Sequence, residues 1–160
     1  MPRRPQHRQA SRSDKLAGAE IHSEVMTRLR RVHQRYTAQR REIIGVLANF
    51  SHPLTIQEIR EHSIDLAQSS VYRNLLVLEE FNIVTRVVTN GEIGRYELAE
   101  DITGHHHHLI CSQCGVVRDV VVPPALELDI DQALSALTGR EGFTLEHHRL
   151  DVFGRCAECT

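Results

Sequence analysis

The 160-residue sequence contains no tryptophan, and aromatic residues make up only 4% of it. Leucine, isoleucine and valine must therefore form most of any hydrophobic core. No run approaches the ~20 consecutive apolar residues that a membrane-spanning helix needs. The first residues are polar and basic, unlike the apolar segment of a secretory signal. We expect a cytoplasmic protein that does not enter a membrane.

Sequence motifs of common enzymes are also missing. His-Glu-x-x-His, Gly-x-Ser-x-Gly and a phosphate-binding glycine-rich loop do not occur. We therefore expect a protein that is not an enzyme. A zinc-dependent hydrolase with an open His/Glu site is kept as an alternative, and a metal-buffering protein without a DNA role is another.

The net charge of -2 conceals an asymmetry along the chain. Residues 1–41 hold eleven of the 19 basic residues but only three of the 21 acidic residues. Such a segment suits a polyanion, because each neutralised phosphate releases condensed counterions. We interpret residues 1–12 as a disordered basic tail, and the arginines between 28 and 41 as candidates for DNA binding.

Helical patterns fill most of the first eighty residues. Apolar residues recur at helical spacing from about Asp14, and Thr37 can cap a second helix. Thr55-Ile56-Gln57-Glu58 is a capping box that opens a third helix, and Ser69 or Ser70 can cap a fourth. Strand-forming residues follow, with a hairpin turn signal at Asn90-Gly91.

Helices followed by a β-hairpin predict a winged helix-turn-helix domain, here over residues 13–98. In this arrangement the fourth helix enters the DNA major groove. Tyr72 and Arg73 lie off the buried face of that helix, so their side chains are available for DNA. The alternative is a small helical domain that binds nothing.

A smaller unit follows a predicted linker over residues 99–104. In residues 105–160 we predict strands at 107–111, 116–122 and 143–153, and a helix from Pro123 to about Leu137. The chain as a whole is predicted to be α+β, with an N-terminal winged helix and a C-terminal α/β domain.

All four cysteines occur in two Cys-x-x-Cys pairs, Cys111/Cys114 and Cys156/Cys159. Two such pairs can complete a closed, tetrahedral zinc site, which is structural rather than catalytic. Because 41 residues separate the pairs, a folded sheet must bring them together. Disulfides are the alternative, but they are rare in the cytoplasm.

Four consecutive histidines, His105 to His108, precede the first cysteine pair. If they lead into a strand, alternate side chains face opposite ways, so His105 and His107 would serve one site and His106 and His108 another. A surface histidine run is the alternative. Nitrogen and oxygen ligands suit Fe(II), Mn(II), Zn(II) or Co(II). Other residues able to join such sites are His52, Glu97, Asp119, Glu127 and His148.

Taken together, several motifs resemble those of the ferric uptake regulator (Fur) family of bacterial metalloregulators. The resemblance covers roughly Arg35 to Cys159. It is carried by Tyr36-Thr37-Ala38-Gln39-Arg40, Ser70-Val71-Tyr72-Arg73-Asn74-Leu75, Ile83-Val84, Arg95-Tyr96-Glu97-Leu98, His105 to Gly115, and the final Cys156-Ala157-Glu158-Cys159.

The resemblance implies a homodimeric, metal-activated repressor that binds AT-rich inverted repeats in double-stranded DNA. The C-terminal domain would be the dimerisation domain, with the four cysteines holding a structural zinc. Tyr72 and Arg73 match the family's recognition-helix contacts. Tyr36, Arg40 and Lys15 match contacts to the DNA backbone or minor groove.

The resemblance also implies two further metal sites. The sensing site would comprise His52, Glu97, His106, His108 and Asp119, and would span the two domains. A second site would comprise His105, His107, Glu127 and His148. His107 stands where iron-type members commonly have Asp, and Asp119 where Glu is frequent. We expect an iron-responsive repressor of metal homeostasis genes, with zinc-, manganese- or peroxide-sensing members of the family as alternatives.

Overall fold

The structure is a computed structural model that describes residues 12–89 and 94–160, with side chains from residue 18 onwards. It divides into two compact units whose boundary lies between Thr103 and Gly104. Residues 1–11 of the predicted basic tail and the predicted turn at Asn90-Gly91 lie outside the described residues.

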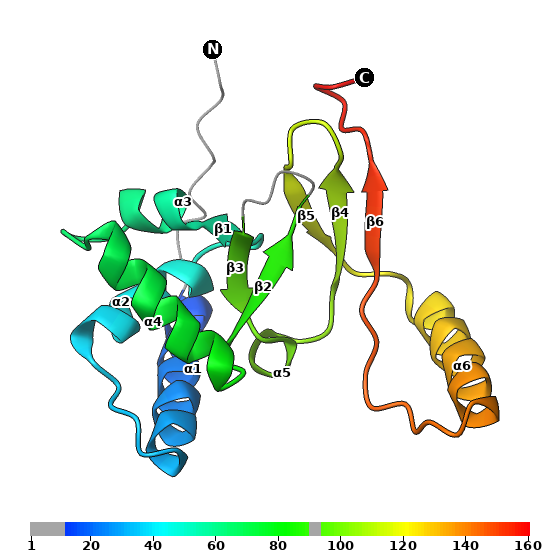
Figure 1. The fold of residues 1–160 in the computed structure, drawn as a ribbon, viewed down its shortest axis with the longest axis horizontal. Helices are drawn as coiled ribbons and strands as arrows, with labels where there is room; N and C mark the ends of the chain where they lie inside the picture. Colours follow the sequence, from blue (N-terminus) through cyan, green and yellow to red (C-terminus); the bar gives the residue numbers. More distant parts are fainter. Residues whose placement is uncertain (1–11, 90–93) are drawn as a thin grey trace. The chain divides into compact units, whose positions relative to one another are not determined.

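The first unit combines a helical bundle with a small antiparallel sheet (Figure 1). The sheet has the strand order β1-β3-β2, and β2 and β3 form the wing. This arrangement confirms the predicted winged helix-turn-helix. The elements are α1 (Arg12–Arg31), α2 (Ala38–Ala48), β1 (Leu54–Thr55), α3 (Ile56–Glu61), α4 (Gln68–Glu80), β2 (Val84–Val88), β3 (Gly94–Leu98) and α5 (Glu100–Thr103).

Side-chain caps begin two of the helices as predicted. The Thr37 hydroxyl accepts a hydrogen bond from the Arg40 backbone N–H at the start of α2. Thr55 and Glu58 form the complete capping box of α3. The predicted cap of α4 is wrong, because this helix begins at Gln68, two residues earlier than a Ser69 cap allows. Ala67 occupies the cap position and has no side-chain oxygen to accept a bond.

Aliphatic side chains from the helices and the sheet form the core of the first unit, as the scarcity of aromatic residues requires. The helix α4 contributes the apolar face that its spacing predicts. Fully buried members of this core include Val25, Leu29, Ile43, Ile44, Ile59, Val71, Leu75, Leu78 and Ile83.

The short helix α5 occupies most of the predicted linker and is fixed to the first unit. Arg28 Nη1 of α1 lies 2.7 Å from the Asp101 carboxylate and also donates to the Asn82 carbonyl. The carbonyl of Ala99 accepts from the backbone N–H groups of Ile102 and Thr103. The residue after α5, Gly104, has a positive φ of 96°, a conformation that glycine adopts without strain.

The second unit contains a three-stranded sheet and one long helix. Its elements are β4 (His107–Cys111), β5 (Val117–Val120), α6 (Pro124–Arg140) and β6 (Asp151–Gly154). The strand order is β5-β4-β6, with β4 antiparallel to β5 and parallel to β6. Figure 1 shows α6 standing clear of the sheet, and none of its residues is buried.

The predicted strand over residues 143–153 is only partly present, because only its last residues, from Asp151, pair with a neighbouring strand. The two units together confirm the predicted α+β class. Among the described residues, no helix is both long enough and apolar enough to cross a membrane.

Candidate metal centres and DNA-contact residues

The strand β4 presents its histidines to opposite faces of the second unit. His107 and His108 are consecutive in β4, and each is only 1% exposed. His107 lies opposite Val120 in the β5 register, and His108 lies opposite Asp119. Side chains alternate along a strand, so the histidine run is divided between two separate clusters, as the sequence pattern indicates.

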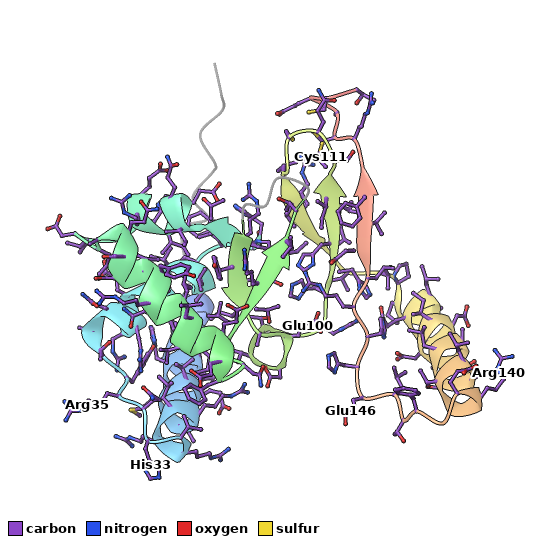
Figure 2. The ribbon with its side chains drawn as sticks, viewed as in Figure 1. His33, Arg35, Glu100, Cys111, Arg140 and Glu146 are labelled. Atoms are coloured by element: carbon purple, nitrogen blue, oxygen red, sulfur yellow. The ribbon has the colours of Figure 1, made fainter. Side chains whose placement is uncertain are left out.

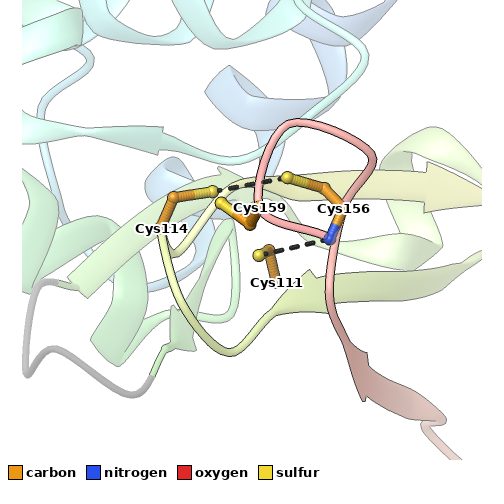
Figure 3. Close-up of side chains that lie close together, drawn as sticks. All are labelled: Cys111, Cys114, Cys156 and Cys159. Atoms are coloured by element: carbon orange, nitrogen blue, oxygen red, sulfur yellow. Dashed lines mark hydrogen bonds between the residues drawn. The ribbon is translucent and has the colours of Figure 1, made fainter.

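The four cysteines lie together where β4 ends and the chain turns after β6. One sulfur atom from each residue lies within 4.8 Å of the other three. Figure 3 shows the four sulfurs around a common point, with Cys114 and Cys156 3.7 Å apart. Zn–S bonds of ~2.3 Å in a tetrahedron place sulfurs ~3.8 Å apart. The cysteines therefore fit a structural zinc site, which would tie β4 to the segment after β6.

Neighbouring groups separate the pKa values of these thiols. Backbone N–H groups of Cys114, Cys156 and Gln113 lower the pKa of Cys111 to about 6. The neighbouring Cys156 raises the pKa of Cys159 to about 12. All four are free thiols in the structure. Since zinc binds thiolates, its binding must release protons from this cluster.

A second cluster joins His105, His107, Glu127 and His148, whose ligand atoms also lie within 4.8 Å of one another. Glu127, in the first turn of α6, is at the centre of this cluster. Its carboxylate oxygens lie 3.0 Å from His105 Nε2, 2.9 Å from His107 Nε2 and 3.0 Å from His148 Nε2. The hydrogen bond from His107 lowers the pKa of Glu127.

Two ring nitrogens of this cluster are buried without a hydrogen bond in the described part of the chain, His107 Nδ1 and His148 Nε2. The short distance from His148 Nε2 to Glu127 is thus a close contact without hydrogen-bond alignment. Nitrogens converging on a carboxylate in this way fit a divalent metal better than a set of hydrogen bonds. Three histidines and one carboxylate form a donor set suited to zinc.

The opposite face of the sheet carries His106, His108 and Asp119. Their ligand atoms lie within 4.8 Å of one another, and His108 Nε2 lies 3.8 Å from the Asp119 carboxylate. His106 Nδ1 lies 2.9 Å from the carbonyl of Gly104. A carbonyl oxygen only accepts, so this contact favours the tautomer of His106 that carries its proton on Nδ1.

Three residues near these clusters were not predicted from the sequence. Asp131 lies 3.0 Å from His148 Nδ1, and Asp151 lies 2.9 Å from His108 Nδ1. Arg149 in turn contacts the Asp151 carboxylate at 3.1 Å. Asp131 follows Glu127 by one helical turn, a spacing visible in the sequence. Asp151 depends on the parallel pairing of β6 with β4, which the sequence pattern does not indicate.

The remaining residues predicted for the sensing site, His52 and Glu97, belong to the first unit. His52 is half-buried and packs edge-on against Phe50, with ring centroids 5.5 Å apart. Burial lowers the pKa of His52, which keeps the ring neutral, as a metal ligand must be. Glu97 lies in β3, opposite Thr85 of β2. The participation of both residues in a metal site stays a prediction.

Two of the predicted DNA contacts lie on the exposed face of α4. Tyr72 is 49% exposed, and Arg73 is also exposed, with its Nε donating to the Ser69 carbonyl one turn earlier. The buried face of the same helix holds Val71, Leu75 and Leu78. Tyr72 and Arg73 are thus free to approach a DNA groove, as the sequence pattern indicates.

The other predicted DNA contacts are less accessible. Arg40 is only 9% exposed, and its guanidinium donates to Asn74 on α4, Gln34 and the Arg35 carbonyl. The Tyr36 hydroxyl contacts His22, and the Arg41 guanidinium lies over the Tyr36 ring, 4.8 Å from its centroid. Arg40 therefore holds α4 against the preceding loop, and its contact with DNA stays a prediction. Lys15 lies in α1, but its side chain is outside the described residues.

The described residues place the two kinds of site in different units. Figure 2 shows Cys111 at the end of β4 in the second unit, and the loop with His33 and Arg35 in the first. The first unit holds the exposed face of α4 with Tyr72 and Arg73. The second holds the three clusters of potential metal ligands.

Comparison with known proteins gives a consistent family assignment. The sequence model of the ferric uptake regulator family matches residues 31–153. The chain is 30% identical over 141 residues to the peroxide operon regulator of Bacillus subtilis, covering 86% of this chain and 92% of that protein. It is 29% identical over 140 residues to the peroxide-responsive repressor PerR of Staphylococcus aureus, covering 85% of this chain and 89% of that protein.

Solved structures with the same fold include two ferric uptake regulators. The Helicobacter pylori protein is described as having three functional metal-binding sites. It matches with a TM-score of 0.70 at 27% identity, and the match covers 89% of this chain and 93% of the Helicobacter pylori chain. The Vibrio cholerae protein matches with a TM-score of 0.66 at 26% identity, and the match covers 82% of this chain and 98% of the Vibrio cholerae chain.

Proposed function

Because the chain belongs to the ferric uptake regulator family of metal-responsive regulators, we propose that it is a homodimeric repressor of metal homeostasis genes. It binds an AT-rich inverted-repeat operator when a divalent metal, Fe(II), occupies its sensing site. The relatives are transcriptional regulators, so the hydrolase alternative has no support from them. The observation that carries the proposal is the pair of histidine clusters on opposite faces of β4, in a chain whose helix α4 also exposes Tyr72 and Arg73.

His106, His108 and Asp119 form the core of the proposed sensing site, and His52 and Glu97 complete it on the resemblance alone. A bound divalent metal would supply a positive charge and fixed bond directions to these side chains. Metal can favour the DNA-binding state only if it binds that state more tightly than the other. Ligands drawn from both units would provide such a difference.

The four cysteines hold a structural zinc in this proposal, and the cluster of His105, His107, Glu127 and His148 holds a second divalent metal. Its three nitrogen donors favour zinc over manganese. The zinc held by the cysteines has a closed set of ligands and therefore serves the fold rather than sensing.

A homodimer is supported by the apolar side chains that the second unit leaves exposed. Phe143 is 72% exposed and Phe153 is 51% exposed, and α6 exposes Leu126, Leu128 and Leu137. Large apolar side chains left exposed in one small unit favour burial against a partner. A twofold dimer would also match the inverted repeat of the proposed operator.

A second candidate function is a peroxide-responsive repressor. The curated relatives with 29–30% identity carry that description, whereas the solved structures above are ferric uptake regulators. Both candidates require a metal-dependent contact with DNA. They differ in whether peroxide releases the DNA from the metal-loaded protein.

The experiment that tests the proposal measures binding to the DNA upstream of the protein's own gene, with and without Fe(II), Mn(II) or Zn(II). We expect Fe(II) to promote binding, and replacement of His106 and His108 with Ala to abolish this effect. Binding that is unchanged by all three metals would contradict the proposal. Release by hydrogen peroxide from the Fe(II) complex would favour the second candidate.

A further inference from the structure

His108 lies between two carboxylates that come from the two neighbouring strands. In the sheet register it is opposite Asp119 of β5 and opposite Asp151 of β6. Its Nε2 side faces Asp119, at 3.8 Å from Oδ1. Its Nδ1 lies 2.9 Å from Asp151 Oδ1.

The two carboxylates must have different roles. The nitrogens of one imidazole ring point in widely separated directions, so a single ion cannot bind both Nε2 and Nδ1 of His108. An ionised carboxylate only accepts hydrogen bonds. Two groups face Nδ1: the Asp151 carboxylate at 2.9 Å and the Arg149 Nη2, a donor, at 3.5 Å. Because the carboxylate is the nearer of the two, it favours the neutral ring with its proton on Nδ1 and the Nε2 lone pair on the side of Asp119.

Asp151 is itself held in place by Arg149. The Arg149 Nε donates to the same oxygen, Asp151 Oδ1, at 3.1 Å, and both side chains are about 30% exposed, at 31% and 28%. The ring of His108 is 1% exposed, and its Nδ1 contacts the same Asp151 oxygen. Arg149, Asp151 and His108 thus form a continuous chain of polar contacts behind the ligand atom.

The second cluster repeats this arrangement with a different carboxylate. Asp131 of α6 lies 3.0 Å from His148 Nδ1, while His148 Nε2 faces Glu127 at 3.0 Å. In both clusters an aspartate outside the predicted ligand set occupies Nδ1 and directs Nε2 inward. Outer carboxylates of this kind fix ring orientation and tautomer at metal-binding histidines.

We propose that Asp151, held by Arg149, is a positioning residue that presents His108 Nε2 to the metal of the sensing cluster, and that Asp131 does the same for His148. The inference rests on the proposed function only where it calls the cluster of His106, His108 and Asp119 the sensing site. The tautomer that it assigns to His108 belongs to the metal-free protein.

The first test is the protonation pattern of the His108 ring in the metal-free protein, measured by long-range ¹H–¹⁵N NMR at a pH where the ring is neutral. The signals are assigned by comparison with the His108→Gln variant. We expect a proton on Nδ1 in the wild-type protein and a mixture of tautomers in Asp151→Ala. A wild-type ring protonated on Nε2 would overturn the proposal.

The second test is titration with Mn(II) alone, monitored by the loss of the free-ion EPR signal. Loss of an outer carboxylate weakens metal binding by about 10–100-fold, so we expect Asp151→Ala to lose that much affinity at the sensing cluster. Asp151→Asn, which keeps an acceptor oxygen, should lose less. Asp131→Ala should leave this cluster unchanged and weaken only the second one.

Asp129→Asn serves as the matched control, because Asp129 is an exposed carboxylate on α6 and makes no contact with either cluster among the described interactions. Mn(II) affinity within twofold of wild type in Asp151→Ala would overturn the proposal. So would a loss beyond 1,000-fold, which would make Asp151 a ligand. Failure of the proposed function differs from both results, because Mn(II) would then bind with Asp151-dependent affinity while promoting no DNA binding.

Discussion

At the residue scale, the arginines on α2 and α4 differ in what surrounds their guanidinium groups. Arg73 is exposed on α4, whereas Arg40 is buried and bonded to Asn74, Gln34 and the Arg35 carbonyl. Both belong to motifs on which the family resemblance depends. Their surroundings predict different contributions to DNA binding, one by contact and the other by holding α4 in place.

We expect Arg73→Ala to weaken operator binding by about 1–3 kcal/mol if the side chain reads a base. If it contacts a phosphate, the salt dependence should also fall, with the slope of log K against log salt reduced by about 0.9. Fluorescence anisotropy with labelled operator DNA at several salt concentrations measures both. Arg140→Ala, which removes an exposed arginine at the end of α6, is the control.

Arg40→Lys should also weaken operator binding, but with an unchanged salt slope, because the guanidinium is already bonded to Asn74 and the Arg35 carbonyl inside the first unit. Lysine keeps the charge but cannot make the forked contacts of a guanidinium. The circular dichroism spectrum checks that the helices are retained. A slope reduced as much as in Arg73→Ala would show that Arg40 contacts phosphate after all.

At the element scale, Glu58 connects α3 to the wing. Its carboxylate accepts from the Thr55 backbone N–H at 2.7 Å and from Arg95 Nη1 of β3 at 3.0 Å. Burial alone would raise the pKa of Glu58, but the Thr55 N–H and the Arg95 guanidinium outweigh it, so the pKa lies below its ordinary value. Folding thus favours the ionised form.

A carboxyl whose pKa is lowered in the folded state stabilises the protein above its unfolded pKa, about 4.3 for glutamate. This stabilisation is lost as the pH falls through the lower, folded value. We therefore expect Glu58→Gln to lower the melting temperature at pH 7, and the difference from wild type to shrink steadily below pH ~4. Thermal unfolding across pH measures it. A constant difference would mean that the charge of Glu58 is unimportant.

The elements also show how far sequence patterns reach. Helical spacing and side-chain caps located α2, α3 and the buried face of α4, because these depend on residues close together in the chain. The alternation of His105 to His108 between two faces was predictable for the same reason. Pairing between segments far apart in the chain was not predictable from the sequence. It determines the two-residue strand β1, the parallel alignment of β6 with β4 and the contact of Asp151 with His108.

Residues 143–150 illustrate a second limit. Their alternation of apolar residues favours a strand, but a strand needs a neighbour whose backbone groups complete its hydrogen bonds. Within residues 143–154 only Asp151–Gly154 pairs as a strand, and Leu150 adds a single bond from its carbonyl to the His108 N–H. Alternating apolar residues alone are therefore not sufficient to form a strand.

At the scale of the whole molecule, the cysteine cluster links segments that are 41 residues apart in sequence. Closed zinc sites contribute directly to folding free energy. We expect Cys111→Ser, or zinc removal by a strong chelator, to lower the melting temperature of the second unit by many degrees. Calorimetry with a zinc assay measures this. Ser135→Ala, at an exposed position on α6, is the control, and an unchanged transition in zinc-free Cys111→Ser would contradict a structural role.

The exposed apolar residues of the second unit predict the effect of a charge at the proposed dimer surface. Phe153 lies on the edge strand β6 and is 51% exposed. We expect Phe153→Glu to shift the protein towards monomer in light scattering and to weaken operator binding, since each copy would then hold one half-site. Ile64→Glu is the control, because Ile64 is 82% exposed in the first unit. A dimer unaffected by Phe153→Glu would place the interface elsewhere.

The run of four histidines has a consequence for how this protein tolerates mutation. The pairing of β4 with β5 fixes which face each residue before Leu109 lies on. One additional histidine would therefore lengthen the segment after Gly104 and leave every ligand position filled by histidine. Loss of one codon would instead put glycine where His105 stands. The second cluster would then lose a ligand, while histidines would still fill the positions of His106 and His108. Loss of one histidine from the run would therefore damage one proposed metal site and spare the other.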